Sequence, residues 1–162
     1  MSFQRILAIV GPGEGAGLDD IAAAERIAEL AARAGWAVSC GGRNSGVMAA
    51  AARGAARGGG ISIGLLGSTD SGDAAPELTV ALPTGLHEAR NAVLAQSCDA
   101  MVACGMNPGT AAEVGLALKA GKPVVLIRPG RVARDFFTSL SADRVGIAAS
   151  ADEALGLLTT NS

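Results

Sequence analysis

Residues 99–127, DAMVACGMNPGTAAEVGLALKAGKPVVLI, contain the pattern that decides the fold. Residues 100–104 are a short apolar run, long enough for a strand buried on both faces and too short for a helix. A glycine-bearing loop follows, and residues 110–120 then predict a helix that a glycine and a proline bring to an end. Residues 124–127 predict the next buried strand. The stretch is therefore a strand–helix–strand unit.

The predicted start of this helix favours anion binding. Thr110 and Glu113 have the spacing of a capping box, in which the hydroxyl accepts from the Glu113 amide and the carboxylate reaches back. The first N–H groups of a helix lack partners within it, and the helix dipole makes this end positive. Because Asn107, Gly109 and Thr110 lie where the loop meets the helix, we expect them to bind a phosphate group.

The alternation of strands and helices continues along the whole chain. Further strands are predicted at 5–10, 36–40, 61–66, 78–82 and 145–149, and further helices at 18–34, 47–57, 86–97, 135–140 and 151–158. No linker, composition shift or internal repeat divides the sequence, so we expect residues 1–162 to form a single domain. Such alternation implies right-handed crossovers and a doubly wound parallel sheet. The predicted fold is a three-layer α/β/α sandwich with six or seven strands.

Composition limits the classes of function. The formal net charge of −2 argues against a nucleic-acid-binding surface and against an anionic membrane surface. No apolar run approaches the length of a membrane span, and the start of the chain reads as a strand rather than a signal peptide. The three cysteines lack metal-ligand spacing, and the single histidine, His87, has no second ligand near it. We therefore expect buried thiols, no metal site and a cytoplasmic protein.

Glycine-bearing loops follow four of the predicted strands, at 11–17, 41–46, 83–85 and 105–109. In sheets of this kind ligands bind beyond the carboxyl ends of the strands. Glycine lets the backbone approach a ligand closely, so four such loops favour phosphate binding over turn formation alone. Besides the three residues at the helix start, the candidate ligand-binding residues are Gly11, Gly13, Gly41, Gly42, Arg43 and Gly85.

A dinucleotide site of the NAD type is not predicted. The first loop contains a G-x-G element, but Glu14 lies where it would repel a pyrophosphate. No acidic residue ends the second predicted strand to bind a ribose hydroxyl. The glycine loops therefore indicate a phosphorylated ligand of another kind.

Three segments of the chain resemble a known family: GGRNSGVMAAAARGA at 41–55, EARNAVLAQSCDAMVACG at 88–105 and PGTAAEVGLALKAGKPVVLI at 108–127. They look like the family once labelled possible lysine decarboxylases, now grouped with the LOG-type cytokinin-activating phosphoribohydrolases and the molybdenum cofactor carrier proteins. The similarity spans roughly residues 5–127 and is strongest to the short, carrier-like branch. It implies a Rossmann-like fold, a phosphorylated ligand such as a nucleotide or the molybdenum cofactor, no required cofactor, and usually a homodimer.

The chain keeps part of the catalytic signature of the activating enzymes. In their P-G-G-x-G-T-x-x-E motif, Gly109, Thr110 and Glu113 match, whereas residues 105–107 replace Pro-Gly-Gly. Of their M-H-x-R-K element, Arg90 alone remains. If the protein is an enzyme, the resemblance assigns its chemistry to Arg90 and Glu113.

Arg90 and Glu113 each allow more than one interpretation. Arg90 can bind a phosphate, pair with the Glu113 carboxylate or lie on a solvated helix face. Glu113 can stabilise a ribosyl oxocarbenium ion, or it can serve only as the capping partner of Thr110. The helix dipole is expected to favour the ionised form of Glu113, which argues against a role as general acid.

Two classes of function remain. In the first, the protein binds and carries a phosphorylated nucleotide-like or pterin-like molecule such as the molybdenum cofactor, and the polar stretch at 67–77 is a mobile loop that closes over it. In the second, it is a nucleoside 5′-monophosphate phosphoribohydrolase that uses Arg90 and Glu113. The anion-binding residues are present and the catalytic signature is partial, so we favour the binding protein and leave catalysis open.

The predicted helices at 88–97 and 110–120 also bear on assembly. Both are rich in alanine, which lets helices approach closely, and the second is apolar on more of its circumference than one core face requires. We therefore expect a homodimer or a dimer of dimers in which these helices make the contact.

Overall fold

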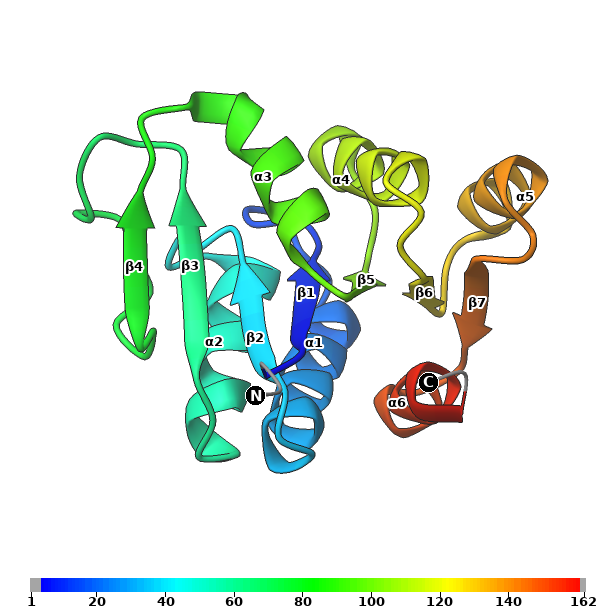
Figure 1. The fold of residues 1–162 in the computed structure, drawn as a ribbon, viewed down its shortest axis with the longest axis horizontal. Helices are drawn as coiled ribbons and strands as arrows, with labels where there is room; N and C mark the ends of the chain where they lie inside the picture. The colour runs from blue at the N-terminus through cyan, green and yellow to red at the C-terminus, as the bar shows by residue number, and fades with distance from the viewer. Residues whose placement is uncertain (1–3, 161–162) are drawn as a thin grey trace.

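The computed structural model describes residues 4–160, which form a seven-stranded sheet covered by helices on both faces (Figure 1). The strands are β1 (Ile6–Val10), β2 (Ala37–Cys40), β3 (Ser62–Leu66), β4 (Val80–Pro83), β5 (Ala100–Cys104), β6 (Val124–Ile127) and β7 (Val145–Ala148). The helices are α1 (Leu18–Arg33), α2 (Gly46–Arg57), α3 (Arg90–Ser97), α4 (Pro108–Lys119), α5 (Arg131–Leu140) and α6 (Ala151–Thr160), with a 3₁₀ turn, η1 (His87–Ala89), ahead of α3.

The strand order is β4-β3-β2-β1-β5-β6-β7, and every pair of neighbouring strands is parallel. The chain builds outward from β1 to the edge strand β4 and then returns to the other side of β1 with β5. The order reverses between β1 and β5, and a crevice forms beyond the carboxyl ends of these two strands. The predicted doubly wound parallel sheet in a Rossmann-like α/β/α sandwich is confirmed.

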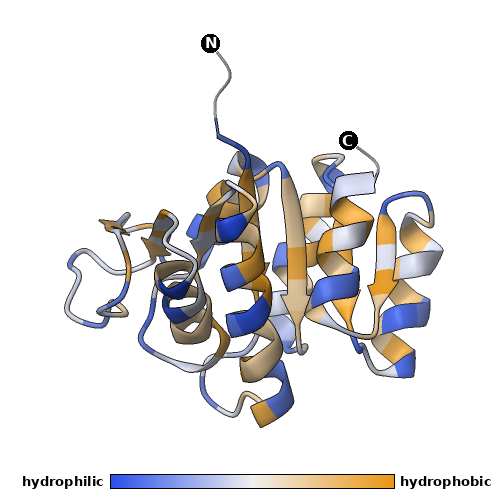
Figure 2. Ribbon diagram, turned by 90° about the horizontal axis from the view of Figure 1, so that it is seen from below, coloured by the Kyte–Doolittle hydropathy of each residue, from blue (hydrophilic) through white to orange (hydrophobic). Residues whose placement is uncertain are grey.

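Side chains of the strands alternate between two hydrophobic clusters. In β1, Leu7 and Ile9 join the cluster beneath α1, α2 and α6, whereas Ala8 and Val10 join the one beneath α3, α4 and α5. Figure 2 shows the hydropathy along the chain, with largely apolar central strands and helices in which apolar and hydrophilic residues are mixed. Both faces of the central strands are buried, which explains why these strands read as continuous apolar runs.

Helices α1 and α2 pack through very small side chains. A Cβ on Gly54 would overlap the Glu25 carbonyl oxygen of α1, and a Cβ on Gly58 would lie 2.6 Å from the Glu29 carbonyl oxygen. Arginines of both helices pair with the two glutamates, for example Arg57 with Glu25. The two helix backbones are therefore nearly in contact, and ion pairs line the outer edge of the interface.

Most element boundaries lie within two residues of the sequence-based ones, whereas α3 begins four residues later and α5 four residues earlier than predicted. Strand β4 begins at Val80 instead of residue 78, because Ser62 and Thr79 exchange hydrogen bonds between side chains and backbone N–H groups, each of 3.0 Å. Helix α5 begins at Arg131 instead of residue 135, directly after Gly130, whose extended conformation serves as the N-cap. None of the helices within residues 4–160 combines the length and apolar character needed to cross a bilayer.

The α1–α2 contact yields a test of the packing. Gly54→Ala should lower the free energy of unfolding by about 1–3 kcal/mol, because the added methyl group meets backbone that cannot move away freely. Gly156→Ala in α6 is the matched control: a Cβ there meets nothing within 4 Å, so this change should raise stability by about 0.5–1 kcal/mol. Urea unfolding of both variants decides, and equal effects at the two sites would contradict the close contact.

Candidate functional site

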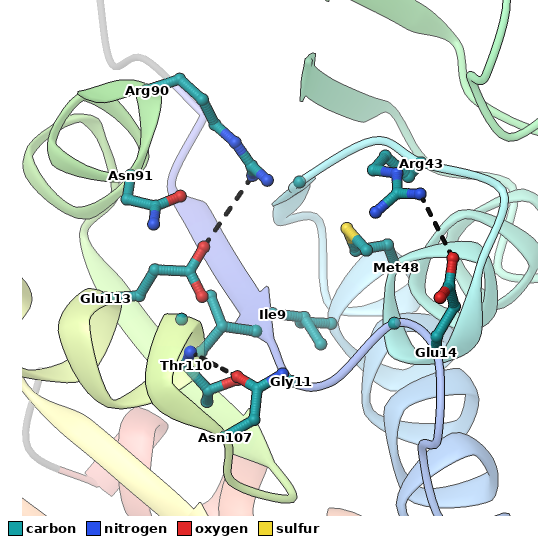
Figure 3. Close-up of a pocket in the computed structure, with 14 residues that line it drawn as sticks. Ile9, Gly11, Glu14, Arg43, Met48, Arg90, Asn91, Asn107, Thr110 and Glu113 are labelled. Atoms are coloured by element: carbon teal, nitrogen blue, oxygen red, sulfur yellow. Dashed lines mark hydrogen bonds and ion pairs between the residues drawn. The ribbon is translucent and has the colours of Figure 1, made fainter. Parts of the chain in front are cut away.

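A cavity of about 290 Å³ lies at the crevice between β1 and β5, where the strand order reverses (Figure 3). Four parts of the chain supply its lining. They are the end of β1 with the following loop (Ile9, Val10, Gly11, Gly13, Glu14), the residues after β2 with α2 (Gly41, Arg43, Met48), α3 (Arg90, Asn91) and the start of α4 (Asn107, Gly109, Thr110, Glu113). Figure 3 shows the α3 and α4 side chains on one side of the cavity, and Arg43, Met48 and Glu14 on the other.

Most of the residues predicted from the sequence line this cavity, namely Gly11, Gly13, Gly41, Arg43, Arg90, Asn107, Gly109, Thr110 and Glu113. Gly42 and Gly85 do not. Gly42 has a φ of +81° and lies against the backbone of Gly64, so its glycine is required by the turn. Gly85 follows the edge strand β4, which β3 and β2 separate from β1. The expected convergence of four glycine loops therefore does not include the loop after β4.

Sequence reasoning missed Asn91, Met48 and the β1 residues Ile9 and Val10, which also line the cavity. Asn91 directly follows Arg90 at the start of a helix, and a polar amide there was a signal that could have been used. Met48 lies in a run of alanines, and nothing in the sequence around it indicates that its side chain faces the cavity. The two β1 residues could have been inferred from their place at the end of a central strand.

The N-terminus of α4 is capped by Asn107 and not by Thr110. The Asn107 Oδ1 atom accepts a hydrogen bond from the Thr110 backbone N–H at 2.8 Å, and Pro108 occupies the first turn. Asparagine is a preferred cap and proline favours the first helical position, so the helix begins two residues earlier than predicted. The predicted capping box of Thr110 and Glu113 is wrong, and both side chains are free for other contacts.

Thr110 and Arg90 each place an unpartnered polar atom at the cavity. Thr110 is 1% exposed, and its Oγ1 atom has no hydrogen-bond partner in the described part of the chain. The same is true of the buried Nη1 atom of Arg90, which passes over Gly41, where a Cβ would overlap it. Buried polar groups are nearly always hydrogen-bonded in folded proteins, so these two atoms mark a place where a ligand is expected.

Arg90 and Glu113 form a loose ion pair inside the cavity. Arg90 Nη1 lies 3.9 Å from Glu113 Oε1, and the two side chains are only 15% and 10% exposed. Figure 3 shows the guanidinium and the carboxylate pointing toward one another from α3 and α4. The separation is too long for a hydrogen bond, so the Arg90 guanidinium keeps capacity for another acceptor.

Burial controls the charge of Glu113. Desolvation raises the pKa of its carboxyl from 4.5 to about 7, although the Arg90 charge acts in the opposite direction. The expectation that the helix dipole would keep Glu113 ionised is wrong. The dipole effect falls off beyond the first turn of a helix, and Glu113 lies past that turn in a nearly water-free position.

Arg43 lies at the rim of the cavity between two carboxylates. Its Nη2 atom is 3.6 Å from Glu14 Oε1, and its Nε atom donates to Asp73 Oδ2 at 3.2 Å. The loop at 67–77, which carries Asp73, is further joined to the residues after β2 by a hydrogen bond from the Ala75 N–H to the Gly42 carbonyl at 2.8 Å. The loop is thus attached beside the cavity in this structure, and its closure over a ligand stays a prediction.

The cysteines offer no nucleophile to the cavity. Burial raises the pKa of Cys40 and Cys98 to about 11 and that of Cys104 to about 12, and none of the three forms a disulfide. They are therefore protonated at neutral pH. Within residues 4–160, no three or more His, Cys, Asp or Glu side chains gather in a way that could hold a metal ion.

The chain is similar to known proteins over most of its length. A model of the SLOG cluster4 family matches residues 4–155. The structure of the molybdenum cofactor binding protein from the phototrophic bacterium Rippkaea orientalis is similar with a TM-score of 0.96 and 37% identity, over 99% of this chain and 98% of that one. The molybdenum cofactor carrier protein of Chlamydomonas reinhardtii gives a TM-score of 0.92 and 38% identity, over 98% of each chain. An uncharacterized protein of Archaeoglobus fulgidus is 33% identical over 124 residues, covering 76% of this chain and 80% of that protein.

The raised pKa of Glu113 makes a prediction about stability. A carboxyl that is harder to ionise in the folded state stabilises the fold below about pH 4.5, and this contribution is lost as the pH rises toward about 7. Glutamine cannot ionise, so the Glu113→Gln variant does not lose this stability. Between about pH 4.5 and pH 7 its free energy of unfolding should therefore increase relative to that of wild type, by up to about 3 kcal/mol. Denaturant unfolding at a series of pH values measures the difference. Glu14→Gln, at the rim of the same cavity, is the control, and an equal trend in both variants would contradict the assignment.

Proposed function

Because the chain belongs to the SLOG cluster4 family, we propose that it binds and carries a phosphorylated pterin of the molybdenum cofactor type as its cargo. Solved structures that it matches over nearly their whole length are a molybdenum cofactor binding protein and a molybdenum cofactor carrier protein. The observation that carries the proposal is the pair of buried, unpartnered polar atoms at the cavity, Thr110 Oγ1 and Arg90 Nη1.

The start of α4 is the proposed phosphate site. The Asn107 side chain accepts the hydrogen bond of the Thr110 N–H. The Gly109 N–H is left as a donor in the first turn. A phosphate there would also accept hydrogen bonds from the Thr110 hydroxyl and from the Arg90 guanidinium. Leaving such groups unpaired costs roughly 1–3 kcal/mol each, so a ligand that satisfies them recovers this free energy on binding. The positive end of the helix dipole adds to the attraction.

The rest of the cavity suits a flat heterocycle with both donors and acceptors. Asn91 offers an amide that can donate and accept, and Met48 gives a polarizable apolar surface on the opposite side. The cavity volume of about 290 Å³ is close to the lower limit of the range of small-molecule sites, roughly 300–1,000 Å³. We propose that part of the cargo stays at the rim near Arg43, where a receiving protein can reach it.

The phosphoribohydrolase alternative is not favoured. Hydrolysis of a glycosidic bond normally uses two carboxyl groups that flank the bond. Besides Glu113, the described lining of the cavity contains one carboxylate, Glu14, which is 86% exposed and pairs with Arg43 at the rim. The raised pKa of Glu113 would suit a general acid, so it is the lack of a second buried carboxyl group in the described lining that disfavours hydrolysis.

We further propose a homodimer or a dimer of dimers with α3 and α4 at the contact. On α3, Val93 is 42% exposed, and a shallow hollow runs along this helix, lined by Ala92, Val93, Gln96 and Ser97. Leu86, just ahead of η1, and Leu82 on the edge strand β4 are also exposed. These side chains support α3 as one half of an interface.

The three buried thiols support the cytoplasm as the compartment.

Thr110→Val and Arg90→Ala test the phosphate site. Thr110→Val keeps the shape of the side chain and removes an unpaired hydroxyl, so it should be at least as stable as wild type and yet bind AMP and the molybdenum cofactor more weakly. Arg90→Ala should weaken binding about 10- to 150-fold, the equivalent of roughly 1.5–3 kcal/mol for a charged hydrogen bond. Arg53→Ala, which removes an arginine paired with Glu25 away from the cavity, is the control.

Isothermal titration calorimetry measures these affinities, and a free-base assay on the same AMP samples tests for turnover. Unchanged affinity in both cavity variants would contradict the phosphate site. Robust release of adenine that disappears in Glu113→Gln would replace the carrier by the phosphoribohydrolase.

Val93→Glu tests the assembly. A carboxylate in the proposed interface should convert the dimer to a monomer at tens of micromolar, a concentration on the order of ordinary weak dimer constants. Val132→Glu in α5 is the matched control, because Val132 is 82% exposed and lies outside the proposed contact. Light scattering reports the mass of each. A monomeric wild type, or dissociation by Val132→Glu alone, would refute the interface.

A further inference from the structure

We infer that the site takes up its phosphate together with a proton, which Glu113 receives, so that a rise in pH above neutrality releases the cargo. The inference rests on the proposed phosphate site and adds to it a role for Glu113 in deciding when the site is filled. It follows from the positions of three side chains in the cavity: Thr110, Glu113 and Arg90.

Thr110 and Glu113 lie three residues apart on α4 and therefore on the same face of the helix. A phosphate that receives the Thr110 hydroxyl is consequently within about one helical turn, roughly 5 Å, of the Glu113 carboxyl group. Both side chains are almost completely buried, so water does little to screen the two groups from one another. Two negative charges at this distance in such a place do not both persist.

Arg90 is a cation that both groups can share. Its Nη1 atom lies 3.9 Å from Glu113 Oε1 without forming a hydrogen bond, and it has no other partner within residues 4–160. A phosphate at the start of α4 competes with the carboxylate for this guanidinium. When Arg90 turns to the phosphate, Glu113 loses the charge that favours its ionised form, and it then binds a proton.

Few other titratable or charged side chains lie near Glu113 in the described part of the chain. The Cys40 thiol at the end of β2 stays protonated, since burial raises its pKa to about 11. From β1 the cavity receives only Ile9, Val10 and Gly11 before the rim, where Arg43 is held by Glu14 and Asp73. His87, the single histidine, is exposed and does not line the cavity.

The free protein is already close to the point of protonation. Desolvation raises the pKa of Glu113 to about 7, so near neutral pH the proton is acquired at little cost. Below that pH the carboxyl is neutral before the phosphate arrives, and affinity should be independent of pH. Above it, each bound phosphate must bring a proton with it, and affinity should fall by up to about tenfold per pH unit.

Titration calorimetry with inorganic sulfate as the probe tests this coupling. Sulfate stays doubly charged between about pH 6 and pH 8.5, so its own titration does not intrude, whereas a phosphate monoester titrates near pH 6. Measurements in paired buffers of different ionisation enthalpy give the number of protons exchanged. We expect wild type to take up close to one proton per sulfate at about pH 8, and its affinity to be about fivefold lower there than at pH 7.

Glu113→Gln is the matched variant. It should bind sulfate as tightly as wild type does at about pH 6, keep that affinity to pH 8, and exchange no proton on binding. A wild-type affinity that does not vary with pH, with no proton uptake, overturns the inference and leaves the phosphate site intact. Absence of binding of both sulfate and AMP at every pH defeats the proposed function and the inference together.

A spectroscopic readout covers the case in which Glu113→Gln does not fold. The ¹³C chemical shift of the Glu113 carboxyl group in wild type reports its ionisation with and without sulfate. A midpoint that moves to higher pH in saturating sulfate supports proton uptake at this residue. A midpoint that stays in place, or moves to lower pH, overturns it.

Discussion

The parallel pairing of β1 with β5, in the register that sets Val10 opposite Ala103, is the constraint on which the rest of the structure depends. It joins two halves of the sheet that the chain builds in opposite directions, and it opens the crevice between the loops that follow β1 and β5. Gly11 makes the junction feasible, because any Cβ there would overlap the Cys104 carbonyl oxygen and the Val47 side chain. Loops from β1 and β2 and the starts of α3 and α4 then meet around one cavity.

Within this cavity, desolvation outweighs the other electrostatic effects. The Arg90 charge favours the carboxylate form of Glu113, and burial still raises the pKa of this carboxyl to about 7. The same exclusion of water leaves Thr110 Oγ1 and Arg90 Nη1 without partners in the described chain. The fold thus maintains two unsatisfied polar groups at the cavity, as is expected where a ligand binds.

The sequence predicted the fold well and the site in part. Strand–helix alternation and apolar runs such as residues 100–104 follow from local patterns, so the parallel sheet could be inferred directly. The glycines that follow β1 and β2 are also a local pattern, and they correctly indicated two loops of the cavity. Strand order is not a local property, and Gly85 was therefore assigned to a cavity that its edge strand cannot reach. The capping box failed because two caps, Asn107 and Thr110, competed within one turn, and spacing alone does not rank them. The ionisation of Glu113 depends on burial, which only the packed structure specifies.

The close packing of α1 against α2 has a consequence for how precisely the cavity is held. The residues at that interface are mostly glycine and alanine, such as Ala28, Ala32 and Gly54, which have no side-chain rotamers to lose when the chain folds. Ordering this wall behind β1 and β2 therefore costs little side-chain entropy, and few rotamer changes there can alter its shape. The residues that β1 and β2 carry to the cavity rest on a support that is rigid for entropic reasons, which limits thermal variation in the distance between the two sides of the site.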